Sequence, residues 1–77
     1  MDKETFGACW HALKLLEIEI IKELARLWND GSADSEHVRD QTNVLMGIKA
    51  SESQIDLLCR LETGIDVKTC YKEYAAW

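Results

Sequence analysis

The chain has 77 residues and a formal charge of −5, because 14 acidic side chains outweigh 9 basic ones. This length allows one domain, and 47% hydrophobic residues without any proline argue against disordered, collagen-like and linker-type chains. The acidic balance makes nucleic acid and membrane surfaces unfavourable partners and suits a basic protein surface.

The first predicted element is a long amphipathic helix over about residues 3–29. Asp2 or Thr5 can cap its start, and Gly31 suits the position just beyond its end. When residues are placed about 100° apart, most apolar ones share one broad face. This main face comprises Phe6, Cys9, Trp10, Leu13, Leu16, Ile20, Ile21, Leu24, Leu27 and Trp28, and Leu15, Ile18 and Ala25 lie on the back.

A second helix is predicted over about residues 35–62, with Asp34 or Ser35 as its cap. Ser51 and Gln54 match a capping box, so the helix either continues or kinks near residue 50. Because the apolar residues before and after residue 50 lie on the same side of the helix, we favour a continuous or gently bent helix. Its main face comprises Val38, Gln41, Val44, Leu45, Ile48, Ile55, Leu58 and Cys59, and Met46, Ala50, Leu57 and Leu61 lie nearly opposite.

A short third helix is predicted over about residues 66–76. Gly64 suits the end of the preceding helix and Asp66 the cap of the next. Val67, Cys70, Tyr71 and Tyr74 then recur at helical spacing. The predicted fold is all-α: a hairpin of two long helices with a short C-terminal helix, forming a single domain over residues 1–77.

Each long helix has apolar residues on two sides, although a helix in a small monomer needs only one buried stripe. Exposing the second stripe would leave a sticky surface. We therefore predict that hairpins assemble into a helical-bundle homo-oligomer, a homodimer or larger. The alternatives are that the third helix hides the second stripe, or that these are scattered surface residues. The expected interface residues are Leu15, Ile18, Trp28, Met46, Leu57, Leu61 and Trp77.

Polar residues interrupt the main faces. Glu17 lies within the first, and His37, Gln41 and Glu52 lie within the second. A buried carboxylate needs a partner or a proton. These residues form a polar layer that fixes register, or lie at the rim of the core, or line a ligand pocket at a subunit seam.

Catalytic and metal sites have little support in the sequence. The three cysteines lack CxxC spacing, and His11 and His37 lack metal-ligand spacing, so we expect reduced thiols, no metal and no cofactor. No cysteine or serine has an adjacent histidine that indicates a nucleophile, and the chain is predicted not to be an enzyme. Without a basic N-terminal region or a spanning apolar run, a cytoplasmic location is expected.

The favoured function is a small acidic interaction protein that self-associates and binds another protein, most simply a basic one. Acidic helical proteins of this size are frequent among accessory and inhibitor proteins of phages and mobile elements, which is a similarity of style only. One alternative is a helix-turn-helix-like DNA-binding regulator formed by residues 51–77. Another is an oligomer that binds a nucleotide through Lys68, Lys72, Tyr71 and Tyr74.

Overall fold

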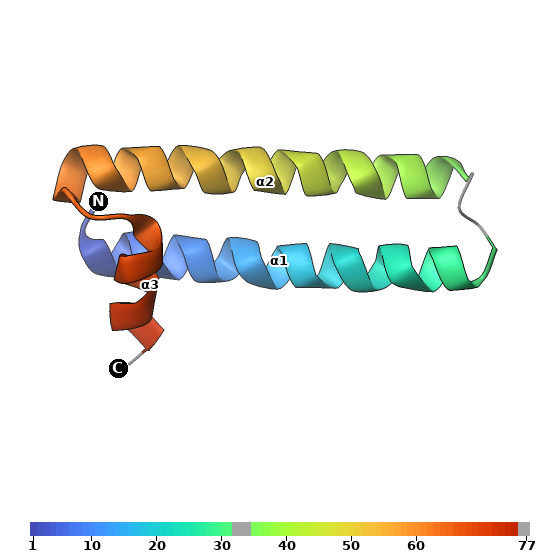
Figure 1. Cartoon of the computed structure of the whole chain (residues 1–77), viewed down its shortest axis with the longest axis horizontal. Helices are drawn as coiled ribbons and strands as arrows, with labels where there is room; N and C mark the ends of the chain where they lie inside the picture. Colours follow the sequence, from blue (N-terminus) through green and yellow to red (C-terminus); the bar gives the residue numbers. More distant parts are fainter. Residues whose placement is uncertain (32–34, 76–77) are drawn as a thin grey trace.

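The computed structural model describes residues 1–31 and 35–75, apart from the side chain of Tyr74. α1 and α2 run antiparallel as a hairpin, and α3 crosses α1 near the start of the chain (Figure 1). The all-α fold is confirmed, and the hairpin layout agrees with the predicted one. Within the described residues the chain forms three helices and no strand, namely α1 (Lys3–Asn29), α2 (Glu36–Thr63) and α3 (Val67–Ala75).

The long helices begin at residues whose side chains cap the first turn. Asp2 accepts a hydrogen bond of 2.8 Å from the backbone N–H of Thr5. Ser35 accepts one of 3.2 Å from the N–H of Val38. These bonds satisfy amides that have no partner within the helix. Asp34, the other candidate cap of the second helix, lies outside the described residues.

Glycines stand just beyond the ends of both long helices. Gly31 has a φ of +77° and Gly64 a φ of +79°, a left-handed conformation that other residues adopt only with strain. Between these two ends, α2 runs without interruption through Ser51. The capping pattern at Ser51 therefore starts no new helix, because its neighbours already have helical hydrogen-bond partners.

The hydrophobic core lies at the end of the hairpin where α3 packs. Its buried members come from all three helices, and Tyr71 packs against them while stacking on His11 at 5.7 Å between ring centroids. Farther along the hairpin, Leu27 and Ile48 are buried but belong to no such cluster. The core cluster comprises Phe6, Trp10, Cys59, Val67 and Cys70.

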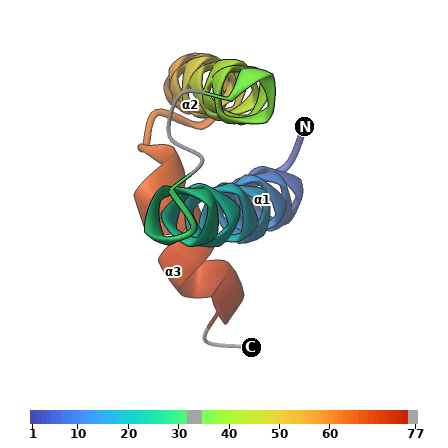
Figure 2. The same ribbon diagram turned by 90° about the vertical axis from the view of Figure 1, so that its right-hand side faces the viewer.

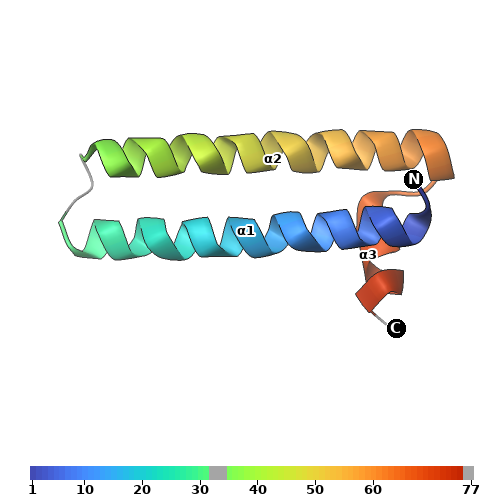
Figure 3. The same ribbon diagram turned by 180° about the vertical axis from the view of Figure 1, so that it is seen from behind.

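The molecule is elongated. Its Cα atoms extend over 45 × 23 × 13 Å, with a radius of gyration of 15.0 Å. A compact chain of this length would have a radius of about 11 to 12 Å. α3 lies against one side of α1 only, and the view from behind shows α1 and α2 uncovered (Figures 2 and 3). Away from α3, the protein is therefore a single layer of two helices.

No helix among the described residues is both long enough and apolar enough to cross a membrane.

Candidate interaction surface

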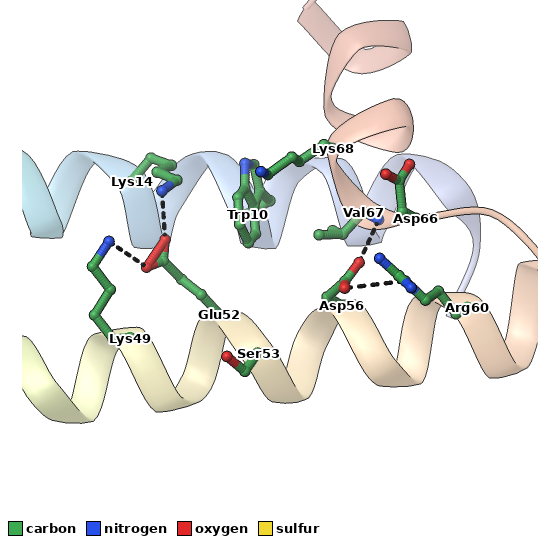
Figure 4. A pocket seen from close by; sticks show the side chains of 10 residues that line it. All are labelled: Trp10, Lys14, Lys49, Glu52, Ser53, Asp56, Arg60, Asp66, Val67 and Lys68. Carbon is green, nitrogen blue, oxygen red and sulfur yellow. Dashed lines mark hydrogen bonds and ion pairs between the residues drawn. The ribbon is translucent and has the colours of Figure 1, made fainter.

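Four charged side chains meet between α1 and α2 near the middle of the hairpin. The carboxylate side chains of Glu17 and Glu52 are only 8% and 6% exposed. Lys14 Nζ lies 3.1 Å from Glu17 Oε2 and 2.9 Å from Glu52 Oε2. Lys49 Nζ pairs with Glu17. It also lies 3.8 Å from Glu52 Oε1, and Figure 4 shows Lys14 and Lys49 both pointing toward the Glu52 carboxylate. Each carboxylate thus faces both ammonium groups, and the charges of the cluster balance.

The balance of charge explains how the buried carboxylate of Glu17 remains ionised. Lys49, and then Lys14, hold the pKa of Glu17 at about 2, although burial alone would raise it. The carboxylate of Glu52 raises the pKa of Lys14, whose ammonium also lies 4.7 Å from the centre of the Trp10 ring. Glu52 Oε2 has no partner with regular hydrogen-bond geometry among the described residues. Its attraction to the ammonium group of Lys14, 2.9 Å away, is therefore the interaction that stabilises it.

The structure separates the polar residues of the predicted layer. Glu17 and Glu52 are buried together, and Gln41 is half-buried. His37 is exposed instead, because it lies in the first turn of α2 at the far end of the hairpin, where it meets Glu23 at 3.3 Å. His37 is therefore not buried together with Glu17 and Glu52. The cluster is completed within one chain and needs no second subunit.

Sequence reasoning missed the two lysines. Both belong to the same short pattern, because Lys14 precedes Glu17 and Lys49 precedes Glu52 by three residues. At that spacing the side chains of one helix are neighbours. Two copies of a Lys-x-x-Glu pattern, each with its glutamate on an apolar face, are a signal that could have indicated the paired cluster.

A groove of about 370 Å³ lies beside the cluster, on the side of the hairpin where α3 packs (Figure 4). Basic and acidic residues alternate along it, and Arg60 is paired with Asp56 at 3.1 Å. The groove therefore has no single sign of charge. The described residues contain no group of three or more side chains suited to a metal ion. The groove is lined by Trp10, Lys14, Lys49, Glu52, Ser53, Asp56, Arg60, Asp66, Val67 and Lys68.

The residues proposed for nucleotide binding are not gathered at this groove. Lys68 lines it, whereas Tyr71 stacks on His11 and Lys72 lies farther along α3. The side chain of Tyr74 is outside the described structure. The aromatic ring that would stack on a base and the lysines that would bind a phosphate therefore do not line one cavity.

Asp56 ties the third helix to the second. Its Oδ1 accepts a hydrogen bond of 3.0 Å from the backbone N–H of Val67, in the first turn of α3. We expect Asp56→Ala to lower the free energy of unfolding by about 1 kcal/mol, the usual cost of losing a cap. Hydrogen exchange should accelerate in α3 more than in α1. Asp56→Asn keeps an acceptor and should cost less, and equal losses for both variants would contradict this role.

The side of the hairpin away from α3 carries apolar residues. Lys14 and Asp56 line the groove on the α3 side. Two residues span about 200° of a helix, so Leu16 and Leu58 project to the opposite side. They are 54% and 45% exposed. We call this surface the open face; it comprises Cys9, Leu13, Leu16, Ile20, Val44, Ile48, Ser51, Ile55 and Leu58, none of which is charged.

Apart from Ser51, the open face consists of residues that the sequence placed on the main apolar faces. A single neighbouring helix covers only part of so broad a face, and α3 covers the opposite side. Most of the residues expected at the interface lie elsewhere, and all that are described remain exposed. The outer apolar residues are Leu15, Ile18, Met46, Leu57 and Leu61, whereas Trp28 belongs to the main face and is 71% exposed.

The alternative in which the third helix hides the second stripe is wrong, because α3 ends up against α1 near the start of the chain. Trp77, the remaining residue expected at the interface, lies outside the described part.

No protein-family model, curated protein or solved structure matches this chain.

Proposed function

We propose that this protein is a non-enzymatic interaction protein that works as a homo-oligomer, most simply a dimer joined through its open face. The observation that carries the proposal is that this face has eight apolar residues, one serine and no charge, and that three of its apolar side chains, Leu16, Val44 and Leu58, are 45% to 54% exposed. Monomeric proteins rarely leave such a surface uncovered. Two hairpins meeting face to face would form a four-helix bundle, in which each helix gains a second neighbour.

The open face is smaller than a standard dimer interface. It runs over residues 9–20 and 44–58, about 20 Å along the hairpin, and two adjacent helices are about 20 Å wide with their side chains, so the face measures on the order of 400 Å². A partner in a standard interface contributes about 800 Å², so a stable dimer would also bury surface around the open face. The chain exposes 5275 Å², whereas a compact monomer of 8.8 kDa would expose about 4,800 Å². Pairing of the open faces would remove this excess.

A second protein would bind to the surfaces that such a dimer leaves free. Leu57 and Leu61 lie away from the open face and are among the most exposed apolar side chains. The net charge of −5 favours a basic partner surface. The mechanism would be occupation of that partner's surface rather than chemistry. The groove gives less support to nucleotide binding, because its carboxylates already face most of its cations.

Sedimentation equilibrium of the purified protein tests the proposal. We expect a mass of at least twice 8.8 kDa at protein concentrations of tens of micromolar. Cys9, half-buried on the open face, should react with a maleimide faster as dilution separates the subunits. A monomeric mass over this whole range would overturn the proposed self-association.

A further inference from the structure

Two cysteine side chains meet in the core where α3 packs on the hairpin. Cys59 Sγ of α2 lies 3.2 Å from Cys70 Sγ of α3, and both residues are fully buried. The third cysteine, Cys9, lies on the open face and belongs to no such pair among the described contacts. The proximity of Cys59 and Cys70 has no role in the proposed self-association.

We propose that Cys59 and Cys70 form a disulfide, a covalent modification site that ties α3 to α2. Their sulfur atoms are only about 1.2 Å farther apart than the roughly 2.05 Å of a disulfide bond. The loop between them is short and is already turned by Gly64 in its left-handed conformation. Closing the bond therefore requires little movement of the backbone.

The oxidant is a low-molecular-weight disulfide such as oxidised glutathione. One cysteine loses its proton and its thiolate attacks a glutathione sulfur, which breaks the glutathione disulfide and releases one glutathione thiolate. The second cysteine thiolate then attacks the protein sulfur of this mixed disulfide and releases the other glutathione thiolate. Two protein thiols are oxidised by two electrons, one glutathione disulfide is reduced, and the two released protons protonate the departing thiolates.

Undocking of α3 controls the rate of this reaction. Burial, and then the neighbouring Cys59, raise the pKa of Cys70 to about 11, so the docked thiol is neutral and unreactive. α3 has nine residues, fewer than an isolated helix needs to be stable, so its docking is reversible. Once the bond forms, α3 is fixed on the hairpin. Val67 and Lys68 then become permanent walls of the groove.

Peptide mapping of the unmodified protein tests the pairing directly. Trypsin separates the three cysteines, because cleavage sites after Lys3, Lys14, Lys49, Arg60, Lys68 and Lys72 place each in its own peptide. After treatment with oxidised glutathione and alkylation of remaining thiols, we expect peptides 50–60 and 69–72 joined, and peptide 4–14 alkylated. A link between Cys9 and either other cysteine, or alkylation of all three, would overturn the proposal.

Stability provides a second measurement. Closing this loop should lower the equilibrium constant for unfolding about 100-fold and raise Tm by about 15 °C. Cys9→Ser should keep the full difference in Tm between the oxidised and the reduced protein, whereas Cys70→Ala should abolish this difference. If peptide mapping finds the disulfide but a reductant leaves the Tm unchanged, the inference that this bond fixes α3 on the hairpin would be wrong. Both readouts are independent of whether the chain dimerises.

Discussion

Leu58→Glu should convert the protein to a monomer, whereas Leu57→Glu should leave the dimer intact. The two leucines are neighbours in α2 and are 45% and 59% exposed, so either change should leave the fold of one chain largely unaffected. They differ in direction by about 100°, and only Leu58 lies on the open face. Because both variants carry the same Leu-to-Glu change, a difference between them shows which side of α2 forms the dimer interface.

The expected effect is large because a two-fold dimer contains each substitution twice. Burying the exposed part of a leucine contributes about 2 kcal/mol, and a glutamate in its place adds the cost of burying a charge. Across two copies, the dimer dissociation constant should rise on the order of 1,000-fold. Sedimentation equilibrium measures the mass, and circular dichroism confirms that the helices persist.

α1 offers a second matched pair for the same experiment. Leu16 lies on the open face and the adjacent Leu15 does not, with exposed fractions of 54% and 52%. Leu16→Glu should dissociate the dimer and Leu15→Glu should not. If Leu15→Glu and Leu57→Glu dissociate it instead, the subunits meet through the outer apolar residues, and the assignment of the open face is wrong.

Glu17→Gln should lower the free energy of unfolding by about 2 to 3 kcal/mol. The change leaves Lys14 and Lys49 sharing the single carboxylate of Glu52 in a place that is poorly hydrated. Removing one partner of a buried pair typically costs about 3 to 5 kcal/mol. The cost should be smaller here, because both ammonium groups reach solvent. Urea denaturation measures the difference.

A paired substitution provides the control. Glu17→Leu combined with Lys49→Met removes one charge of each sign and leaves Lys14 facing Glu52 at 2.9 Å. Because apolar residues of similar volume often replace a buried ion pair without loss, the double variant should be more stable than Glu17→Gln. A double variant that is less stable would show that the cluster contributes net stability.

The same cluster should make stability depend on acid. The folded-state pKa of Glu17 is held at about 2, below its ordinary value of about 4.5. Its contribution is therefore complete above pH 4.5 and is lost as the pH falls towards 2. Glu17→Gln should flatten this part of the profile. Arg26 lowers the pKa of Glu23 similarly, but that pair is more exposed, so Glu23→Gln should have a smaller effect that salt abolishes.

Local features of this fold could be predicted from the sequence. Asp2, Ser35, Gly31 and Gly64 mark helix ends because each acts on backbone groups within a few residues of itself. The uninterrupted phase of apolar residues across Ser51 likewise favours one long α2. Helical periodicity and capping depend on near neighbours along the chain, which is why one sequence sufficed for them.

The candidate surface could be predicted only in part. The sequence predicted apolar residues on two sides of each long helix, but it did not indicate which of these sides stays uncovered. It identified Glu17 and Glu52 as buried polar residues without finding Lys14 and Lys49. The uncovered side and the two lysines both depend on which residues of one helix face those of another. The position of a residue around its own helix does not reveal these neighbours.

The sequence by itself determined that this chain forms three helices with more apolar surface than they bury. Only the tertiary structure decided which surface stays open, because that depends on the side of α1 on which α3 packs. The same packing brings Cys59 to Cys70 and sets Val67 against Asp56. Contacts between distant parts of the chain depend on how whole helices pack, and helical periodicity leaves that choice undetermined.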